Sequence, residues 1–370
     1  MNTKTILVTG ARSLAALDLA RTFHQAGMRV VCVDSVDRTL CSYSEAVACY
    51  RKTASPRFAF GAFIADLQRI VSEEQIDLLV PTCEEIFYIA KAKEQLQTQV
   101  FAEVFDKLHL LHHKWEFYRY LRKGGYQTPF TELWDGRARD CKWVLKPVYS
   151  RFGAETQIVS GRWPSRQLEN ANPFIVQAYV EGEKICSYSV CREGRVLAHG
   201  AYRPLHTMGI GAAICLKSIS DPTVDAFVRS VVADLRFTGQ ISFDFIRGNE
   251  LNCIECNPRA TSGVHLFQRN PELTRCFLGQ ESATLYPQVD VIFGEPLFLL
   301  WFGLRQGELF TRRFWSHLFQ AHSPILLPSD KRVAAAFPLL LFDAAKQTLL
   351  RGKSFGQSMS HDMEYNGECV

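Results

Sequence analysis

The sequence has 370 residues, of which 47% are hydrophobic and 22% are charged, and this is the composition of a soluble globular protein. The length is too great for one typical core, so we expect two or three domains. A net charge of +4 is small for this length and no dense basic run accompanies it, which argues against a nucleic-acid partner.

The first predicted elements are a strand at 5–10, a helix at 14–25 and a second strand at 29–34. This order predicts the beginning of a parallel sheet. The turn at 10–14 lacks the G-x-G-x-x-G spacing that lets a backbone approach a dinucleotide pyrophosphate. NAD binding is therefore disfavoured, and we interpret Asp34 as a strand-end residue.

Because residues 1–9 read directly as a strand, we expect no signal peptide. The 12 cysteines are scattered along the chain, which favours reduced thiols in a cytoplasm over a disulfide framework. Cys253 and Cys256 form a C-x-x-C pair, but they have no second pair at zinc spacing. We interpret that pair as structural.

A helix at 64–73 and a strand at 77–81 follow, and directly after that strand come Glu84 and Glu85. Loops that follow parallel strands face ligands, so either acid could contact a substrate. Capping of the next helix is an equally good explanation for both.

Residues 105–125 are predicted to form a helical connector that carries Lys114. A new strand then ends at Lys146, which is followed by proline, and a loop at 148–153 separates it from another strand at 155–159. A lone lysine is most often a solvated surface group, so these two lysines gain meaning only from their context.

Further along, a strand at 174–180 is closed by the acidic turn 181–183, and a hairpin joins 187–192 to 195–199. An amphipathic helix at 224–235 leads to the segment with the most informative chemistry.

That segment is a second predicted hairpin, whose strands at 242–246 and 251–257 both alternate with a period of two. Asp244, Glu255 and Asn257 then share one face. A short turn centred on residues 248–249 would set Asp244 opposite Cys253 and diagonal to Glu255.

Carboxylate and amide oxygens are the ligands that Mg²⁺ prefers, and Mg²⁺ often takes few protein ligands and leaves the rest to substrate phosphates. A polar outer face of an ordinary hairpin is the alternative. Arg259, which follows directly, favours the metal site, because its guanidinium binds phosphate oxygens in pairs.

After residue 263 the pattern is less regular, with aromatic, helical segments interrupted by three prolines and a polar tail after 354 that we expect to fray. The most apolar runs, 296–304 and 333–342, are shorter than the roughly 18 residues that span a bilayer. We interpret them as buried core, with a hydrophobic surface for a partner or an oily substrate as the alternative.

Taken together, the order of these motifs resembles the ATP-grasp family, in which two α+β lobes close on ATP. The similar region runs from Lys114 to Gly263. The resemblance implies an α/β and α+β fold: a Rossmann-like domain at 1–105, a two-lobed ATP-grasp domain with antiparallel sheets at 106–285 and a mobile lid at about 140–180, and a mostly helical region at 286–370.

The resemblance also implies a role for each matching residue. The phosphates of ATP would be bound by Lys114, Lys146 and the flap residues Ser150, Arg151 and Gly153. The adenine-facing hinge would be Gln177, Tyr179 and Val180, and Glu183 or its neighbour would hold the ribose. Gln177 stands where the family commonly has an acid. Asp244, Glu255 and Asn257 would hold Mg²⁺ or Mn²⁺.

By the same resemblance, Arg259 would lie at the transferred phosphoryl group. Recognition of a substrate carboxylate is expected near residues 259–263 and 202–211, where we select Arg203, with a structural role for it as the alternative. His206 and His265 are weaker candidates for proton transfer. The implied activity is that of a cytoplasmic, ATP-dependent ligase that joins a small carboxylate to an amine. A bicarbonate-dependent carboxylase and a non-catalytic nucleotide-binding subunit stay open as alternatives. We expect small-molecule partners, no membrane and no nucleic acid, and a homodimer is compatible with the sequence.

Overall fold

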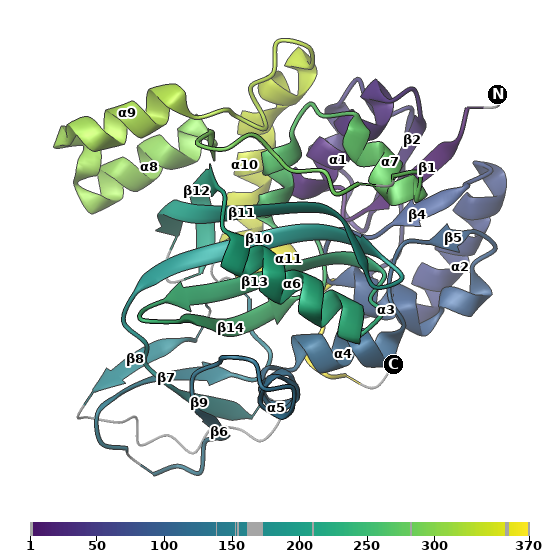
Figure 1. Ribbon diagram of the computed structural model, residues 1–370. Coiled ribbons are helices and arrows are strands. Elements are labelled where there is room, and N and C mark those ends of the chain that lie inside the picture. The colour runs from purple at the N-terminus through teal and green to yellow at the C-terminus, as the bar shows by residue number, and fades with distance from the viewer. Residues whose placement is uncertain are drawn as a thin grey trace.

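The computed structural model is shown in Figure 1. It describes residues 3–368 apart from 138, 152, 154, 161–172, 209–210, 282 and 352–354.

A five-stranded parallel sheet occupies the N-terminal part, in the order β3-β2-β1-β4-β5. Its strands are β1 (Thr5–Thr9), β2 (Arg29–Asp34), β3 (Cys49–Lys52), β4 (Leu78–Val80) and β5 (Gln99–Val100). Its helices are α1 (Leu14–Gln25), α2 (Phe60–Glu73) and α3 (Glu85–Lys91), with short 3-10 turns η1 (Cys41–Tyr43) and η2 (Lys93–Gln95). Both β1 and β4 are wholly buried, as their unbroken apolar runs predict.

The predicted helical connector is two helices, α4 (Phe105–His112) and α5 (Lys114–Lys123). His113 separates them: its backbone is extended, and its Nδ1 accepts a hydrogen bond from the backbone N–H of Glu116 at 3.2 Å. This cap makes Lys114 the first residue of α5.

Two antiparallel sheets follow, and the predicted α/β and α+β fold class is confirmed. The smaller has the order β6-β9-β7-β8 and the larger the order β14-β13-β10-β11-β12-β15. The smaller sheet contains β6 (Thr131–Leu133), β7 (Lys142–Pro147), β8 (Gln157–Ser160) and β9 (Phe174–Ala178). The larger contains β10 (Glu183–Arg192), β11 (Arg195–Met208), β12 (Ala212–Ile219), β13 (Gly239–Arg247), β14 (Leu251–Asn257) and β15 (Ile292–Gly294).

Helix α6 (Pro222–Asp234) covers one face of the larger sheet, with Phe227 against Phe243 and Phe245 at 5.5 and 5.1 Å between ring centroids. Because successive residues of a strand face opposite sides, Asp244 lies on the other face. That face is turned toward the smaller sheet (Figure 1).

The register of the β13 and β14 hairpin differs from our prediction. Asp244 pairs directly with Glu255, not with Cys253, because the register shifts between Asp244 and Phe245 and leaves Ile254 as an extra residue. Such a β-bulge cannot be read from alternation alone. It brings the two carboxylates closer than predicted.

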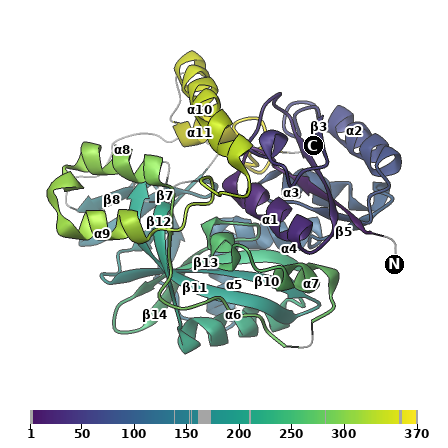
Figure 2. The ribbon, with the colours of Figure 1, turned by 90° about the horizontal axis from the view of Figure 1, so that it is seen from above.

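The remaining helices are η3 (Ser262–Phe267), α7 (Glu272–Leu278), α8 (Pro296–Gln306), η4 (Glu308–Phe310), α9 (Arg312–Gln320), α10 (Lys331–Arg351) and α11 (Phe355–Ser360). Figure 2 shows α8 and α9 side by side at one edge and α10 at another. The prediction that both apolar runs are buried is wrong for most of 296–304, where the buried residues of α8 are Leu299 and Gly303. By length and composition, residues 331–350 of α10 could cross a membrane, and 22% of that apolar window is buried in the protein.

The prediction that the tail after 354 frays is wrong for its last described part. Met363 and Tyr365 are buried, and the Tyr365 ring stacks on Phe87 with centroids 5.0 Å apart. An aromatic ring buries a large apolar area, which explains why this polar segment is held in place.

Candidate active site

Lys146 lies near the end of β7, in the smaller sheet, and its side chain is buried. Its Nζ donates to Gln177 Oε1 at 3.0 Å and to the backbone oxygen of Ile254 at 3.2 Å. The second acceptor is the carbonyl that the β-bulge in β14 frees. Burial lowers the pKa of Lys146 to about 8; the charge of Glu255 opposes this fall and that of Lys114 adds to it.

Lys114 projects from the first turn of α5 toward the same place. Its Nζ lies 3.2 Å from Glu255 Oε1 and 3.5 Å from the backbone oxygen of Ser150. Burial by itself would raise the pKa of Glu255, but the charges of Lys114 and Lys146 outweigh it, and the net pKa is lowered. Glu255 is therefore ionised at neutral pH.

Lys184, which the sequence reasoning did not select, completes the charge arrangement. It lies on β10, and its Nζ is 3.1 Å from Asp244 Oδ2. The negative charge of Asp244 raises the pKa of this lysine. Local sequence gives no sign of this contact, because β10 pairs with β13 across about 60 residues of sequence, with Cys186 opposite Asp244.

The two carboxylates, Asp244 and Glu255, lie opposite each other on one face, and Asn257 follows on the same side of β14. Within the part of the chain that the structure describes, no group of three or more His, Cys, Asp or Glu residues has metal-binding geometry. Two carboxylates and an amide suit Mg²⁺, which takes one or two carboxylates and completes its shell with phosphates and water. The residues present fit such an ion.

Arg259 lies just beyond the hairpin and contacts both Asn257 and the parallel-sheet part of the chain. Its Nη2 is 3.3 Å from Asn257 Oδ1 and 3.6 Å from Oε1 of Glu84. Thr261 caps η3 in the next turn. Gly263 allows η3 to lie against β10, since a Cβ there would stand 2.4 Å from the Cβ of Tyr188.

Glu84 is a buried acid whose carboxylate forms ion pairs or hydrogen bonds with three parts of the chain. Arg151 of the flap bonds to it through Nε, Arg259 pairs with its other oxygen, and the backbone N–H of Tyr365 donates to it at 3.0 Å. Burial opposes its ionisation, but the charge of Arg151 and the weaker effect of Arg259 lower the pKa of Glu84 to about 2. Of the two acids considered after β4, this is the one that faces the site.

Glu85 does not cap α3, which has no side-chain cap. Its Oε1 accepts from the backbone N–H groups of Thr82 and Cys83, each at 3.1 Å, and from Thr9 Oγ1 at 2.6 Å. It therefore stabilises the turn at the start of α3.

The flap loop joins the tail as well as Glu84. The Arg151 guanidinium donates to Asn366 Oδ1 at 2.8 Å and to the backbone oxygen of Tyr365 at 2.5 Å. Ser150 is buried beside Lys114, and the Gly153 carbonyl accepts from Thr156 N–H at 3.1 Å. Phe152, Ala154 and residues 161–172 of the predicted lid lie outside the described residues.

At the predicted hinge, Gln177 is oriented from both ends: Oε1 accepts from Lys146, and Nε2 donates to Thr131 Oγ1 at 3.0 Å. The Lys142 ammonium lies 3.7 Å from the ring centroid of Tyr179. Val180 leads into Gly182, where a Cβ would stand 2.2 Å from the Arg247 carbonyl. Only glycine lets this connection pass so close to the end of β13.

Glu183 begins β10 and pairs with Arg203 Nε at 3.0 Å. Both side chains are about half exposed. Among the described residues, no hydrogen bond or ion pair joins Arg203 to Arg259 or Glu84. Of the segment 202–211, residues 209 and 210 lie outside the described part.

Neither histidine candidate lies with these groups. His206 Nε2 is 2.9 Å from His317 Nδ1 of α9, and His265 Nδ1 is 2.5 Å from Asp18 Oδ2 of α1. Each joins two packed elements of the fold.

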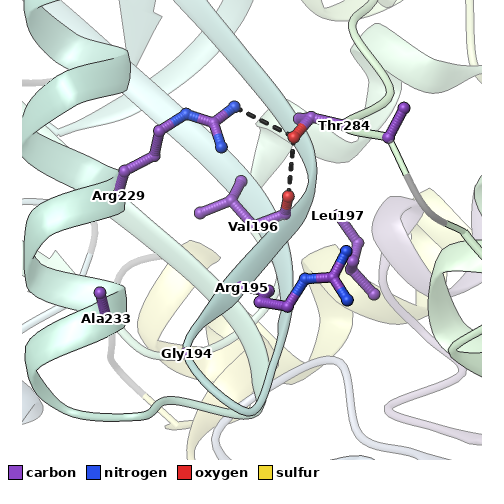
Figure 3. Close-up of a pocket in the computed structure, with 8 residues that line it drawn as sticks. Gly194, Arg195, Val196, Leu197, Arg229, Ala233 and Thr284 are labelled. Atoms are coloured by element: carbon purple, nitrogen blue, oxygen red, sulfur yellow. Dashed lines mark hydrogen bonds between the residues drawn. The ribbon is translucent and has the colours of Figure 1, made fainter.

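Figure 3 shows a separate hollow of about 320 Å³ between α6 and the turn that joins β10 to β11. Arg229 lines it and is held by Asp225 at 2.9 Å and by Thr284 Oγ1 at 3.0 Å. None of the predicted site residues lines this hollow, so it adds nothing to the candidate site.

Comparison with known families gives a match over residues 111–263 to the model of the ATP-grasp domain. This range contains all five phosphate-binding candidates and the whole β13 and β14 hairpin. No curated protein sequence matches the chain.

Among solved structures, the chain is similar to an L-amino acid ligase from Bacillus licheniformis, with a TM-score of 0.55, 16% identity, and coverage of 72% of this chain and 69% of that one. It is also similar to N5-carboxyaminoimidazole synthetase from Staphylococcus aureus, with a TM-score of 0.62, 14% identity, and coverage of 84% and 89%.

A third similar structure is the biotin carboxylase domain of 2-oxoglutarate carboxylase from Hydrogenobacter thermophilus, described with MgADP and bicarbonate. Its TM-score is 0.59 at 13% identity, over 79% of this chain and 74% of that one. Identities this low establish the shared fold and leave the reaction open.

Proposed function

We propose that this chain, whose residues 111–263 match the model of the ATP-grasp domain, is an ATP-dependent ligase that joins a small carboxylate, such as an amino acid, to an amine. The observation that carries the proposal is the convergence of Lys114, Lys146 and Lys184 on Asp244 and Glu255. Two buried and one partly buried ammonium groups around two partly exposed carboxylates suit a metal-bound polyphosphate.

A carboxylate is a poor electrophile because its leaving group would be oxide. In the proposed reaction, a carboxylate oxygen attacks the terminal phosphorus of ATP, the bond to the β-phosphate oxygen breaks, and ADP leaves. The amine then attacks the acyl carbon, phosphate leaves with the oxygen it gained, and the amine loses a proton. Catalysis consists of positioning and charge stabilisation, and no covalent protein nucleophile takes part.

In this proposal Lys114 and Lys146 bind the phosphates beneath a flap that includes Ser150, Arg151 and Gly153. Mg²⁺ or Mn²⁺, when bound, offsets phosphate charge, and its protein ligands are Asp244, Glu255 and Asn257. Arg259 contacts the transferred phosphoryl group.

The remaining roles follow the same scheme. Adenine lies along Gln177, Tyr179 and Val180, and Glu183 binds the ribose. Arg203 binds the substrate carboxylate. To do so, its guanidinium must either break its ion pair with Glu183 or contact both carboxylates at once. The substrates are small molecules, and the reaction belongs in the cytoplasm.

The test is ADP release by the purified chain with Mg-ATP and pools of amino acids and amines. We expect release to require one member of each class, and Glu255→Gln to lower it by on the order of a hundredfold or more, because an essential charge is lost. Glu250→Gln, in the exposed turn of the same hairpin, is the matched control and should keep its activity.

Two results would redirect the proposal. ADP release that requires bicarbonate would favour the carboxylase alternative, which the similarity to N5-carboxyaminoimidazole synthetase and to a biotin carboxylase domain supports. Tight Mg-ATP binding without ADP release from any pool would favour a nucleotide-binding regulatory subunit.

A further inference from the structure

Exposed apolar side chains gather in one part of the molecule. Of the 19 large hydrophobic residues that are exposed among those described, 12 lie between Leu297 and Leu350. Scattered exposed apolar residues are normal, but a concentration of this kind marks an interaction surface. It lies on α8, α9 and α10, away from the candidate active site (Figures 1 and 2).

Helix α8 carries the most regular part of this surface. Leu297, Leu300, Trp301 and Leu304 are exposed at helical spacing, so they form one stripe. The other side of α8 is fixed to the protein: a Cβ at Gly303 would stand 2.6 Å from the Phe314 ring of α9. The stripe therefore cannot turn inward without separating the two helices.

Helix α9 and the turn before it extend the surface. Phe310 is 95% exposed and Phe319 is 79% exposed, and the Trp315 ring stacks on Phe319 with centroids 5.8 Å apart. Aromatic rings of this kind, with a polar handle on tryptophan, are characteristic of protein surfaces at a membrane interface.

Helix α10 presents Leu339, Phe342 and Leu349 to solvent, on one side at helical spacing. Its other side is anchored, because Val333 and Phe337 are buried in the core. Beside the exposed residues, Asp343, four positions after Leu339, pairs with Arg38 at 2.9 Å. Although the helix is long and apolar enough to span a bilayer, these contacts hold it against the protein. It suits a position along a bilayer surface, not across it.

The charge of this segment selects the partner. Residues 296–351 contain seven lysines and arginines but three acids, so they account for the whole net charge of +4, and the rest of the chain is balanced. Two of the three acids, Asp330 and Asp343, are paired with Arg21 and Arg38, and one of the seven cations, Arg332, is paired with Glu45. A second copy would bring like charges together, whereas an anionic surface would be attracted.

We propose that the exposed side of α8 and α9 is a docking surface for an anionic lipid bilayer, with their aromatic and leucine side chains inserted at the headgroup level and their arginines at the lipid phosphates. Helix α10, which contacts α8 through Phe337 and Phe298, lies at the margin of this surface. This position combines burial of apolar area with attraction to anionic lipid, as in interfacial amphipathic helices. It replaces the expectation, drawn from run length alone, that the chain meets no membrane. It is independent of the proposed ligase activity.

The test is co-sedimentation of the full chain with vesicles of phosphatidylcholine alone and of phosphatidylcholine mixed with phosphatidylglycerol. We expect binding to the mixed vesicles that weakens as salt is raised. Phe319→Ser should weaken vesicle binding about tenfold, because the variant lacks one aromatic ring that would insert into the bilayer. Phe130→Ser, which removes a ring that is 56% exposed on the smaller sheet, is the matched control and should leave binding unchanged. Equal thermal unfolding temperatures of the two variants would show that both are folded.

Absence of binding to the mixed vesicles would overturn the proposal. Equal binding to both kinds of vesicle would overturn the choice of an anionic bilayer. A dimer that forms in solution without vesicle binding, and that Phe319→Ser dissociates, would assign the same face to a second copy of the chain.

Discussion

At the scale of single residues, Lys146 shows how position sets chemistry. A lysine in water carries its charge well above neutral pH, but this one is buried and its hydrogen bonds go to an amide oxygen and a backbone carbonyl. A pKa of about 8 follows from that burial. The protonated form, which attracts phosphate, is therefore lost within an accessible pH range.

We predict that ATP affinity falls as pH rises from 7 to 9, by up to about tenfold, because the ammonium loses its proton above its pKa. The dissociation constant measured by calorimetry at each pH is the observable. In Lys146→Arg the charge does not titrate, so the slope should vanish even if affinity is lower. A flat profile in the unmodified protein would contradict this role.

At the scale of elements, the segment 359–366 lies across the carboxyl edge of the parallel sheet. Arg12, which follows β1, donates to Asp362 at 2.8 Å, and Ser55, which follows β3, donates to the Asp362 carbonyl at 2.7 Å. Tyr365 then enters the core beside Phe87 and Tyr88. The edge where a doubly wound sheet would take a ligand is thus covered by the chain itself.

We predict that Tyr365→Ala lowers the free energy of unfolding by about 3 to 5 kcal/mol, the usual cost of deleting a buried aromatic ring. Urea denaturation would measure the change. Tyr286→Ala, at a tyrosine that is 51% exposed, should cost less than about 1 kcal/mol. Similar costs for both would show that the tail contributes little to the core.

At the scale of the whole molecule, Glu84 joins the parallel sheet, the flap and the tail at one carboxylate. Its depressed pKa means that the ionised form is stabilised by folding. That stabilisation is complete above the unfolded pKa near 4.5 and is lost as pH falls toward about 2.

We predict that Glu84→Gln is less stable than the unmodified protein by on the order of 3 kcal/mol at pH 7, with a smaller difference at pH 3. Urea denaturation at both pH values is the measurement. Glu94→Gln, an exposed acid in the same part of the chain, should show no such dependence. A difference that does not change with pH would mean that ionisation of Glu84 is not what holds these parts together.

Much of this molecule could be predicted from local sequence. Apolar runs and alternation predict β1, β2 and β4 of the parallel sheet, but not β3 or β5, and they predict both strands of the β13 and β14 hairpin. The shared face of Asp244 and Glu255 follows from period two. What depends on distant pairing could not be predicted. Three features are of this kind: the bulge at Ile254, the contact of Lys184 with Asp244, and the burial of Tyr365. Each depends on a pairing between segments that local sequence patterns do not identify. The domain boundaries and the roles of the site residues stay predictions.

The place of Tyr365 in the core also has a consequence for how the protein is made. Domains usually fold from the N-terminus as they leave the ribosome. Here the side chains of Phe87 and Tyr88 lack their neighbouring ring until residue 365 has been synthesised. The parallel sheet, though encoded first, is thus among the last parts to be finished, and a nascent chain would expose that apolar surface to chaperones throughout the translation of everything between.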